Sequence, residues 1–408
     1  MTKILLQINV VANSGSTGRI AEELGVMALE NGWRSIVAYG RWACQSRSEL
    51  MRIGNRPGIL WHGFKSVLFD SHGLGSVGAT RKFVHEVAMM KPDIIHLHNI
   101  HGYYINYPIL FDFLAKSHIP VVWTLHDCWS VTGHCAHFQD IGCQKWERGC
   151  ERCPGIVTGN YPKSFLDNSR SNYQNKKRWF TSLPNLTIVP VCNWLDEIIS
   201  RSYLSGFNRR VIVNGIDLRV FRPCDCREKI DARFGTHGKP ICLAVASNWN
   251  RTKGLYDMFA LRESLSSKAV IFMVGLNRKQ IKHLPAGIIG IEKTENINSL
   301  VELYNAADVY VNPTYQDTFP TVNIEAIACG VPVVTYNTGG CADIIDESTG
   351  YVVPTGRVNE LCDRIRKVLQ DGKKHYTANC RTRAEHHFNK VDRYKDYMDL
   401  YERLFESK

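Results

Sequence analysis

Short apolar runs alternate with longer amphipathic stretches along the whole chain. The runs are rich in Val, Ile and Leu and are bounded by Gly, Pro, Asn and Asp, which is typical of strands buried on both faces of a parallel sheet. Strands that alternate with helices in this way predict an α/β fold. In the first half we predict strands at Ile4–Val10, Ser35–Gly40, Asp93–Asn99, Val121–Asp127 and Leu186–Asn193. In the second half we predict strands at Ile241–Ser247, Val270–Gly275, Gly287–Glu292, Val309–Pro313 and Val333–Asn337.

The length of the chain indicates that this pattern belongs to two domains. A chain of 408 residues is too long for one ordinary core. Two series of alternating strands and helices therefore predict two doubly wound domains. In such domains ligands bind at the carboxyl ends of the strands, and we expect them in a crevice between the two domains.

The stretch Asp317–Pro332 carries candidate chemistry. We predict a tight turn, a short helix from about Thr321 to Cys329, and then a buried strand, with Gly330 and Pro332 ending the helix. The unpaired N–H groups of the first helical turn can bind an anion or a hydroxyl. Asp317 and Glu325 flank these donors, and a carboxylate can accept hydrogen bonds from two adjacent hydroxyls. This arrangement suits a polyol, although a capped core helix would also explain it.

These residues resemble the donor-sugar motif of retaining glycosyltransferases of family 4, which have the GT-B fold. The matching residues are Asp317, Phe319, Pro320, Glu325, Ala326, Cys329, Gly330, Pro332 and Val333. The family usually has Glu at both ends of the motif, so Asp317 makes the first carboxylate one methylene shorter. The resemblance implies two Rossmann-like doubly wound domains that face a central cleft.

A second segment resembles one branch of that family, the enzymes that build colanic acid and similar bacterial surface polysaccharides, such as exopolysaccharide and lipopolysaccharide. The branch carries a His-Asp-x-Trp-x-x-Thr-Gly-x-Cys segment, which is present here as His126, Asp127, Trp129, Thr132, Gly133 and Cys135. His126 ends a predicted strand, where an open parallel sheet presents its ligands. The resemblance implies a catalytic role for His126 in contact with the donor sugar, whereas a lone His is more often structural.

The resemblance also places the domain boundaries. Asn214–Asp217, followed by Phe221 and Pro223, is similar to the family's interdomain connection, so we expect a first, acceptor-side domain at residues 1–205 and a donor domain at 206–385. Residues 386–408 carry apolar side chains at helical spacing. In the family this helix crosses back to the first domain, although a plain terminal amphipathic helix would show the same spacing.

Two loops are candidates for binding the donor diphosphate. Gly15 and Gly18 open a helix after the first strand, where they would let backbone donors approach an anion, although a tight turn is the commoner explanation. Lys253 matches a family lysine that contacts the diphosphate, and Arg251 is the candidate for a second cation. Two cations can neutralise a leaving diphosphate as a divalent metal does elsewhere. We therefore expect metal-independent chemistry, while a solvated loop is the alternative.

The cysteines are concentrated after His126. Five of the fourteen lie within residues 128–153, inside an insert at about 128–160. Cys150-x-x-Cys153 is a common half of a zinc site, and Cys135 and Cys143 could complete it. The cluster predicts either a structural zinc or free thiols, and no cofactor is expected for catalysis itself.

Charge and hydropathy limit which classes of binding partner and which cellular location we expect. The formal net charge is +11, yet no helix or arm concentrates it beside stacking aromatics, so nucleic acid is not expected. An anionic membrane surface fits a basic enzyme with a lipid-linked acceptor, although the charge could also be spread over solvated faces. The chain lacks a run of 18 apolar residues and begins with a predicted strand rather than a signal peptide. We therefore expect a cytoplasmic protein, peripheral at the inner face of the plasma membrane.

These observations predict a retaining hexosyltransferase that moves a sugar from a nucleotide diphosphate sugar to a hydroxyl of a lipid-linked saccharide. Glu325 would hold the ribose hydroxyls, and Lys253 with Arg251 the diphosphate. Asp317 would hold the sugar ring together with the backbone N–H groups from Thr318 to Thr321, a stretch that includes Phe319 and Pro320. A nucleotide-sugar epimerase of the same fold and a catalytically silent binding module remain the alternatives.

Overall fold

The computed structural model describes residues 2–407, which form two compact units. The first unit comprises the chain up to Ile212 and again from Tyr394 onward, and the second comprises Val213–Arg393. The predicted boundaries at residues 205 and 385 are therefore several residues too early. The chain stays with the first sheet as far as Ile212, whose N–H donates a 3.2 Å hydrogen bond to the Pro190 carbonyl.

The first unit is built on a seven-stranded parallel sheet with the strand order β3-β2-β1-β4-β5-β6-β7. Its strands are β1 (Ile4–Asn9), β2 (Arg34–Tyr39), β3 (Glu49–Arg52), β4 (Ile94–Leu97), β5 (Val121–Leu125), β6 (Leu186–Pro190) and β7 (Asn208–Arg209). Its helices are α1 (Gly15–Glu30), α2 (Arg56–Phe69), α3 (Val77–Met90), α4 (Tyr107–Ser117), α5 (Pro154–Thr158), α6 (Ser169–Phe180) and α7 (Asn193–Ser200). The strand order reverses between β1 and β4, which is where doubly wound sheets bind their ligands.

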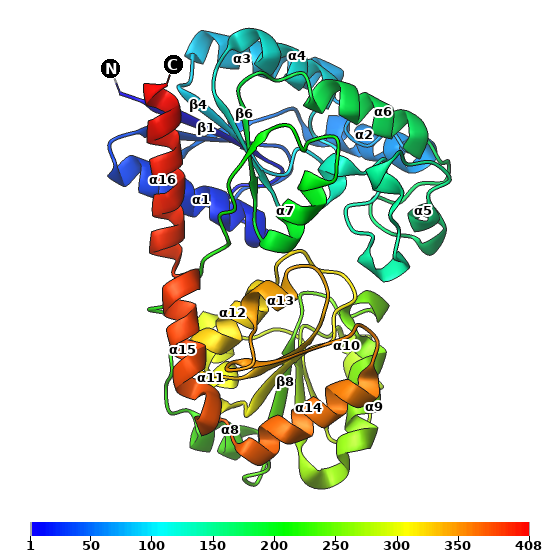
Figure 1. The fold of residues 1–408 in the computed structure, drawn as a ribbon, viewed down its shortest axis with the longest axis vertical. Coiled ribbons are helices and arrows are strands. Elements are labelled where there is room, and N and C mark those ends of the chain that lie inside the picture. Colours follow the sequence, from blue (N-terminus) through cyan, green and yellow to red (C-terminus); the bar gives the residue numbers. More distant parts are fainter. Residues whose placement is uncertain (1, 408) are drawn as a thin grey trace. The chain divides into compact units, whose positions relative to one another are not determined.

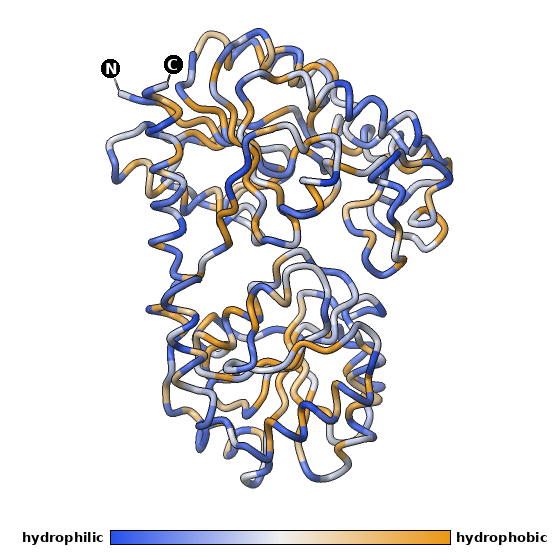
Figure 2. Tube along the Cα trace, viewed as in Figure 1, coloured by the Kyte–Doolittle hydropathy of each residue, from blue (hydrophilic) through white to orange (hydrophobic). Residues whose placement is uncertain are grey.

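Helices cover both faces of this sheet (Figure 1). On one face, α1 packs with the last helix, α16 (Lys390–Glu406), against apolar strand residues such as Leu5 and Val122. On the other face, Trp123 of β5 contacts Phe111 of α4 and Phe180 of α6, with ring centroids 5.6 and 4.9 Å apart. The hydrophobic stretches of the chain coincide with these central strands (Figure 2). Burial of both faces explains why the strand sequences are continuously apolar.

The last helix is shared between the two units, because its first turn belongs to the second unit and the rest to the first. Tyr397 and Tyr401 are buried in the core of the first unit, and the Tyr401 hydroxyl lies 2.6 Å from Nδ1 of His96 on β4. The predicted helix over residues 386–408 is present as α16, but it begins at Lys390 rather than at residue 386. The preceding helix ends at Phe388, and Asn389 interrupts the helical path by pairing with Ile216.

The second unit is built on a six-stranded parallel sheet with the strand order β10-β9-β8-β11-β12-β13. Its strands are β8 (Ile241–Val245), β9 (Val270–Val274), β10 (Ile288–Ile291), β11 (Val309–Asn312), β12 (Val333–Tyr336) and β13 (Gly350–Val353). Its helices are α8 (Arg227–Phe234), α9 (Leu255–Leu265), α10 (Arg278–Lys282), α11 (Ile297–Ala306), α12 (Thr321–Ala328), α13 (Cys341–Ile344), α14 (Val358–Asp371) and α15 (Lys374–Phe388). The order reverses between β8 and β11, so the loops after these two strands lie side by side.

The ten predicted strands are present, with small differences at their ends. Asn193, predicted as the end of a strand, begins α7 instead. The predicted helix from Thr321 to Cys329 is α12, which ends one residue earlier. Within residues 2–407, no helix combines the length and the apolar character needed to cross a bilayer.

Candidate functional site

Polar side chains of the first unit gather at the carboxyl ends of β4 and β5. His126 and Asp127 follow β5 directly, and His98 and His101 follow β4. The parallel pairing of β4 with β5 brings these residues together around a small cavity of about 10 Å³. Both predicted residues, His126 and Asp127, are half-buried there.

The hydrogen bonds of this cluster define which ring nitrogen of the neutral His126 carries the proton. Gln7 donates its amide to the Ala21 carbonyl at 2.7 Å, so its Oε1 is free to accept the Nε2–H of His98 at 3.1 Å. Nδ1 of the neutral His98 is then an acceptor, and Nε2 of His126, 3.2 Å away, donates to it. This leaves Nδ1 of His126 as the acceptor of its ring.

The electrostatic environment keeps this histidine neutral. Burial lowers the pKa of His126 to about 4, and this effect outweighs the opposing charge of Asp127, while His101 adds a smaller lowering. Burial also lowers the pKa of His98 well below its ordinary value. A neutral ring at physiological pH can accept a hydrogen bond from a sugar hydroxyl through Nδ1.

Asp127 is held as a carboxylate by its neighbours. One oxygen lies 2.8 Å from Nε2 of His101, and the other accepts the Trp129 N–H at 2.9 Å. Burial alone would raise the pKa of Asp127, but these partners lower it well below its usual range. Asp127 therefore fixes both His101 and the turn into the following segment.

The loop after β1 contains the predicted phosphate-binding glycines. Gly15 begins α1 with φ +61, a conformation that favours glycine. Gly18 lies in the first turns of α1, where an added Cβ would come within 3.0 Å of Val11. The structure thus places both glycines at the strand-order reversal, and their contact with a diphosphate stays a prediction.

The cysteine-rich segment is the predicted site of either a structural zinc or free thiols. The sulfur atoms of Cys135 and Cys153 lie 3.5 Å apart, and the hydrogen bond from Cys135 lowers the pKa of Cys153. Cys150 packs against Gly133, and Cys143 is half-exposed. Over residues 2–407 no group of three or more His, Cys, Asp or Glu side chains is arranged to hold a metal ion. Of the four candidate thiols, those of Cys135 and Cys153 are in contact, and the zinc site stays a prediction.

A buried lysine anchors this segment. Lys176 on α6 is 1% exposed and donates to the carbonyls of Trp129 and Thr132 at 2.7 and 3.0 Å. Its ammonium nitrogen lies 3.6 Å from the centre of the Trp129 ring. Burial lowers the pKa of Lys176 to about 7. Beside it, a buried pair between His134 and Asp70, 2.6 Å apart, ties the segment to the end of α2.

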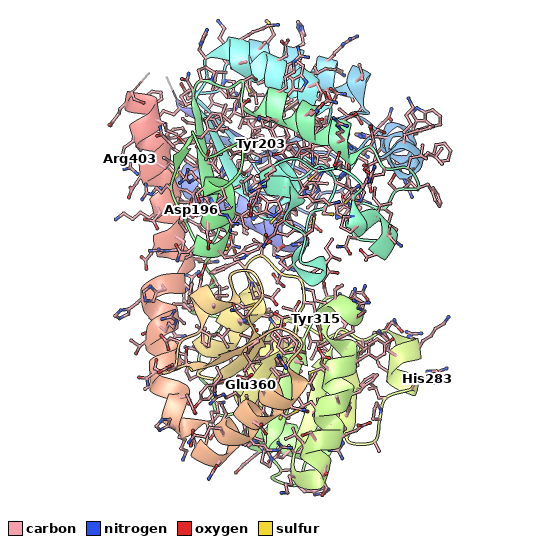
Figure 3. All side chains as sticks on the ribbon, turned by 45° about the vertical axis from the view of Figure 1, so that its right-hand side comes forward. Asp196, Tyr203, His283, Tyr315, Glu360 and Arg403 are labelled. Atoms are coloured by element: carbon pink, nitrogen blue, oxygen red, sulfur yellow. The ribbon has the colours of Figure 1, made fainter. Side chains whose placement is uncertain are left out.

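In the second unit, the loops after β8 and β11 bring two predicted residues into contact. Nζ of Lys253 lies 2.8 Å from an Asp317 oxygen and donates to the Gln316 carbonyl at 3.0 Å. Tyr315, labelled in Figure 3, joins the same loops by donating its N–H to the Thr252 carbonyl at 2.8 Å. The lysine and the carboxylate are both partly exposed, so a ligand can reach the pair.

The backbone around Lys253 explains its position. The Asn250 side chain accepts the Lys253 N–H at 3.0 Å and so caps the start of the helical turn Arg251–Lys253. Gly254 has φ +74, and an added Cβ would lie 2.2 Å from the Pro313 carbonyl oxygen, so only glycine lets the two loops approach. The other predicted cation, Arg251, is exposed beside Tyr315, where its charge opposes the rise in the pKa of that phenol.

The start of α12 is the predicted sugar site. Thr318 and Phe319 are buried, Pro320 is the residue before the helix, and Thr321 begins it. Pro320 has no N–H, so it shapes the turn rather than donating to a ligand as predicted. Gly340 donates its N–H to the Thr318 carbonyl at 2.8 Å, which joins this turn to the loop after β12.

Glu325 faces a partner that the sequence analysis missed. The hydroxyl of Tyr304 on α11 donates to a Glu325 oxygen at 2.8 Å, and Tyr304 is fully buried while Glu325 is half-buried. Tyr304 therefore orients the carboxylate.

Two family models match most of the chain. The model described as Glycosyltransferase Family 4 matches residues 17–220, and the model described as Glycosyl transferases group 1 matches residues 227–387. WcaC of Escherichia coli (strain K12), whose name assigns it provisionally to colanic acid biosynthesis as a glycosyl transferase, is 28% identical over 387 residues. The matched region covers 88% of this chain and 89% of WcaC.

Two further proteins are similar to the chain. The N,N'-diacetylbacillosaminyl-diphospho-undecaprenol alpha-1,3-N-acetylgalactosaminyltransferase of Campylobacter jejuni is 27% identical over 170 residues, which cover 39% of this chain and 44% of that enzyme. The crystal structure of HepE from Anabaena in complex with UDP has a TM-score of 0.69 at 14% identity, covering 98% of this chain and 99% of HepE. The predicted GT-B fold, with two Rossmann-like α/β units, is confirmed.

Proposed function

Since the chain belongs to glycosyltransferase family 4, we propose that it transfers a sugar from a nucleotide diphosphate sugar to a hydroxyl of a lipid-linked saccharide, with retention of configuration. The observation that carries this proposal is the contact of Lys253 with Asp317 in front of α12, which also carries Glu325. The point where the strand order reverses between β8 and β11 thus carries all three groups: a cation for the diphosphate, a carboxylate for the sugar and a carboxylate for the ribose. The names of the similar proteins support bacterial surface polysaccharide biosynthesis as the setting.

In this proposal the donor is held by the second unit. Lys253 exchanges Asp317 for a donor phosphate, and the exposed Arg251 adds a second positive charge. Asp317 then accepts hydrogen bonds from the sugar, together with the N–H groups at the start of α12. Glu325, oriented by Tyr304, accepts the two ribose hydroxyls. The loop of Gly15 and Gly18 would contribute backbone donors.

The chemistry proposed is a front-face displacement. The bond between the anomeric carbon and the donor phosphate oxygen breaks first, and the cations stabilise the charge on the leaving diphosphate. The acceptor hydroxyl attacks from the same face, and the leaving phosphate oxygen takes its proton. His126 contributes by accepting a sugar hydroxyl at Nδ1, which holds the ring during an oxocarbenium-like transition state.

The proposal places the protein in the cytoplasm, at the inner face of the plasma membrane, because a lipid-linked acceptor resides in a membrane. The decisive experiment incubates the full chain with a panel of nucleotide sugars. Slow release of the nucleoside diphosphate from one donor supports a transferase, since water can replace a missing acceptor. Interconversion of two nucleotide sugars would indicate an epimerase, and binding without any turnover would indicate a silent module.

We expect Glu325→Ala to weaken binding of the matching nucleotide diphosphate by about 10- to 100-fold. Loss of a charged acceptor that bonds two hydroxyls costs roughly 1.5–3 kcal/mol. Isothermal titration calorimetry measures the change directly. Glu263→Ala on α9 is a matched control, because this glutamate is exposed and lies outside the proposed site. Equal affinities for the two variants would remove Glu325 from the ribose site.

We expect transfer to survive a strong chelator, because Lys253 and Arg251 neutralise the leaving diphosphate. The assay compares initial rates with and without EDTA, and then after addition of magnesium. Immediate loss of activity that magnesium restores would contradict the charge argument. Metal analysis of the same protein tests the cysteine segment. A content of about one zinc per chain would support binding of zinc by the four thiols.

A further inference from the structure

A large cavity of the first unit lies apart from the strand-end cluster. It has a volume of about 830 Å³ and opens between α2 and α3, beside the end of β3. Three exposed cations, Arg52, Lys65 and Lys82, line it, together with a single carboxylate, Glu86, which lies 3.7 Å from Lys82. The surplus of positive charge suits an anionic ligand.

One wall of the cavity is already ordered around His62. This residue is 1% exposed, and its Nε2 accepts the N–H groups of Gly73 and Gly75 at 3.2 and 3.1 Å. Its Nδ1–H therefore donates to the Ser76 hydroxyl at 2.9 Å. Burial lowers the pKa of His62 to about 4, so the wall is neutral and the three cations carry the charge.

Exposed aromatic and aliphatic side chains lie on the same helix. Leu60, Trp61 and Phe64 of α2 are 65%, 58% and 55% exposed, and the rings of Trp61 and Phe64 stack with centroids 5.6 Å apart. A neighbouring strip adds Phe165, which is 77% exposed and donates its N–H to the Val67 carbonyl at 2.8 Å. Large apolar side chains exposed together mark an interaction surface, and aromatic rings beside basic residues are typical of membrane interfaces.

We propose that this cavity binds the phosphate head group of an anionic phospholipid while Leu60, Trp61, Phe64 and Phe165 enter the interface of the bilayer. Charge complementarity selects an anionic membrane as the partner, because basic residues line the cavity and Lys65 lies 5.3 Å from the Trp61 ring centre. The inference deepens the proposed function by naming the membrane contact of the first unit. The inference rests on the proposed function in one respect, because a lipid-linked acceptor would require the protein to reach a membrane.

A chain of ring contacts joins this cavity to the strand-end cluster within the same unit. His62 lies 5.9 Å from the ring centre of Tyr103, which lies 4.7 Å from that of His72. His72 in turn lies 5.7 Å from the ring centre of His101, the partner of Asp127. A phospholipid held at the cavity would therefore bring the bilayer against the unit that carries His126.

The test measures co-sedimentation of the full chain with phosphatidylcholine vesicles, with and without phosphatidylglycerol, in the absence of any sugar donor. We expect binding only to the anionic vesicles. The triple variant Arg52→Gln/Lys65→Gln/Lys82→Gln should weaken this binding by roughly 100-fold, because each basic residue near an anionic surface contributes to the attraction. Undiminished binding of the triple variant would overturn the proposal.

A second variant separates the cavity from general surface charge. An added Cβ at Gly78 meets no atom within 4 Å, so Gly78→Trp can fill the cavity without a clash in the fold. Gly206→Trp is the matched control at an exposed, equally open position outside the cavity. We expect the first variant to lose vesicle binding at least tenfold and the second to keep it. Equal binding by both would rule out a head-group site.

Two further measurements identify the ligand and show whether a failed test concerns the membrane site or the proposed sugar transfer. Soluble glycerol 3-phosphate should displace the protein from vesicles only weakly, and a protein that binds it tightly but ignores vesicles would exclude a lipid partner. Hydrolysis of the nucleotide sugar in solution is measured on the same variants and should be unchanged. Lost vesicle binding with intact hydrolysis separates the membrane site from sugar transfer, and intact vesicle binding in an inactive protein separates them in the other direction.

Discussion

His126→Ala should lower kcat by roughly 100- to 1000-fold, the loss expected when one preorganised polar group is removed from a reacting centre. The fold should be retained, because His126 is half-buried and makes one hydrogen bond, to His98, which contributes only about 0.5–1.5 kcal/mol. Steady-state kinetics and thermal melting on the same preparation check both parts. His85→Ala, an exposed histidine on α3, is the control for loss of an imidazole.

Two conservative variants test which nitrogen of His126 acts. The side-chain oxygen of Asn can occupy the place of Nδ1, whereas that of Gln reaches only the place of Nε2. Since Nε2 donates to His98 and Nδ1 is the free acceptor, His126→Asn should retain more activity than His126→Gln. The opposite order would show that the tautomer inferred from Gln7 and His98 is wrong. Equal activity of His126→Ala and the parent chain would remove His126 from the site.

Much of the fold could be predicted because the central strands are buried on both faces and are therefore continuously apolar. The three strands that were not predicted, β3, β7 and β13, lie at the edges of their sheets. Glu49–Arg52 is charged at both ends, and Asn208–Arg209 has only two polar residues. Edge strands are half-solvated, so hydropathy gives β3 and β7 little signal, whereas the four-residue β13 is apolar and was missed for its shortness.

The break between the last two helices depends on a tertiary contact. Apolar residues continue at helical spacing from Phe388 to Leu404, which predicted one helix. Ile216 donates to the Phe388 carbonyl at 2.9 Å and accepts from Lys390 at 3.0 Å, and these bonds replace those of a continuous helix. Ile216 lies more than 170 residues before Phe388 in the sequence, so no local pattern can predict this contact.

The candidate site was predicted unevenly for a similar reason. The contact between Lys253 and Asp317 joins loops 64 residues apart, and only the order of β8 and β11 brings them together. His98 and His101 were missed, although a predicted strand at Asp93–Asn99 with histidines near its end was a usable signal. The zinc site stays a prediction, because Cys spacing alone does not determine where the thiols point.

Acid should destabilise the first unit selectively. Burial lowers the pKa values of His62 and His126 to about 4 and those of His72, His96 and His98 well below the ordinary value. In the unfolded chain these histidines take up protons near pH 6.5. As the pH falls from about 6.5 to 4, the unfolded state therefore binds more protons than the folded state, and the free energy of unfolding decreases by about 1.4 kcal/mol per pH unit for each such histidine. Above pH 6.5 both states are neutral and this stability is fully present.

The second unit is the internal control for this prediction, because all five of its histidines are exposed: His237, His283, His375, His386 and His387. Hydrogen exchange followed by mass spectrometry at pH 7.5 and pH 5, corrected for the intrinsic rates, should show loss of protection in β4 and β5 before β8 and β11. His62→Gln keeps an acceptor for the Gly73 and Gly75 N–H groups but cannot titrate, so it should flatten the dependence on pH by about 3 kcal/mol between pH 6.5 and 4. Equal loss of protection in both units, or an unchanged slope in this variant, would show that the buried histidines do not control stability in acid.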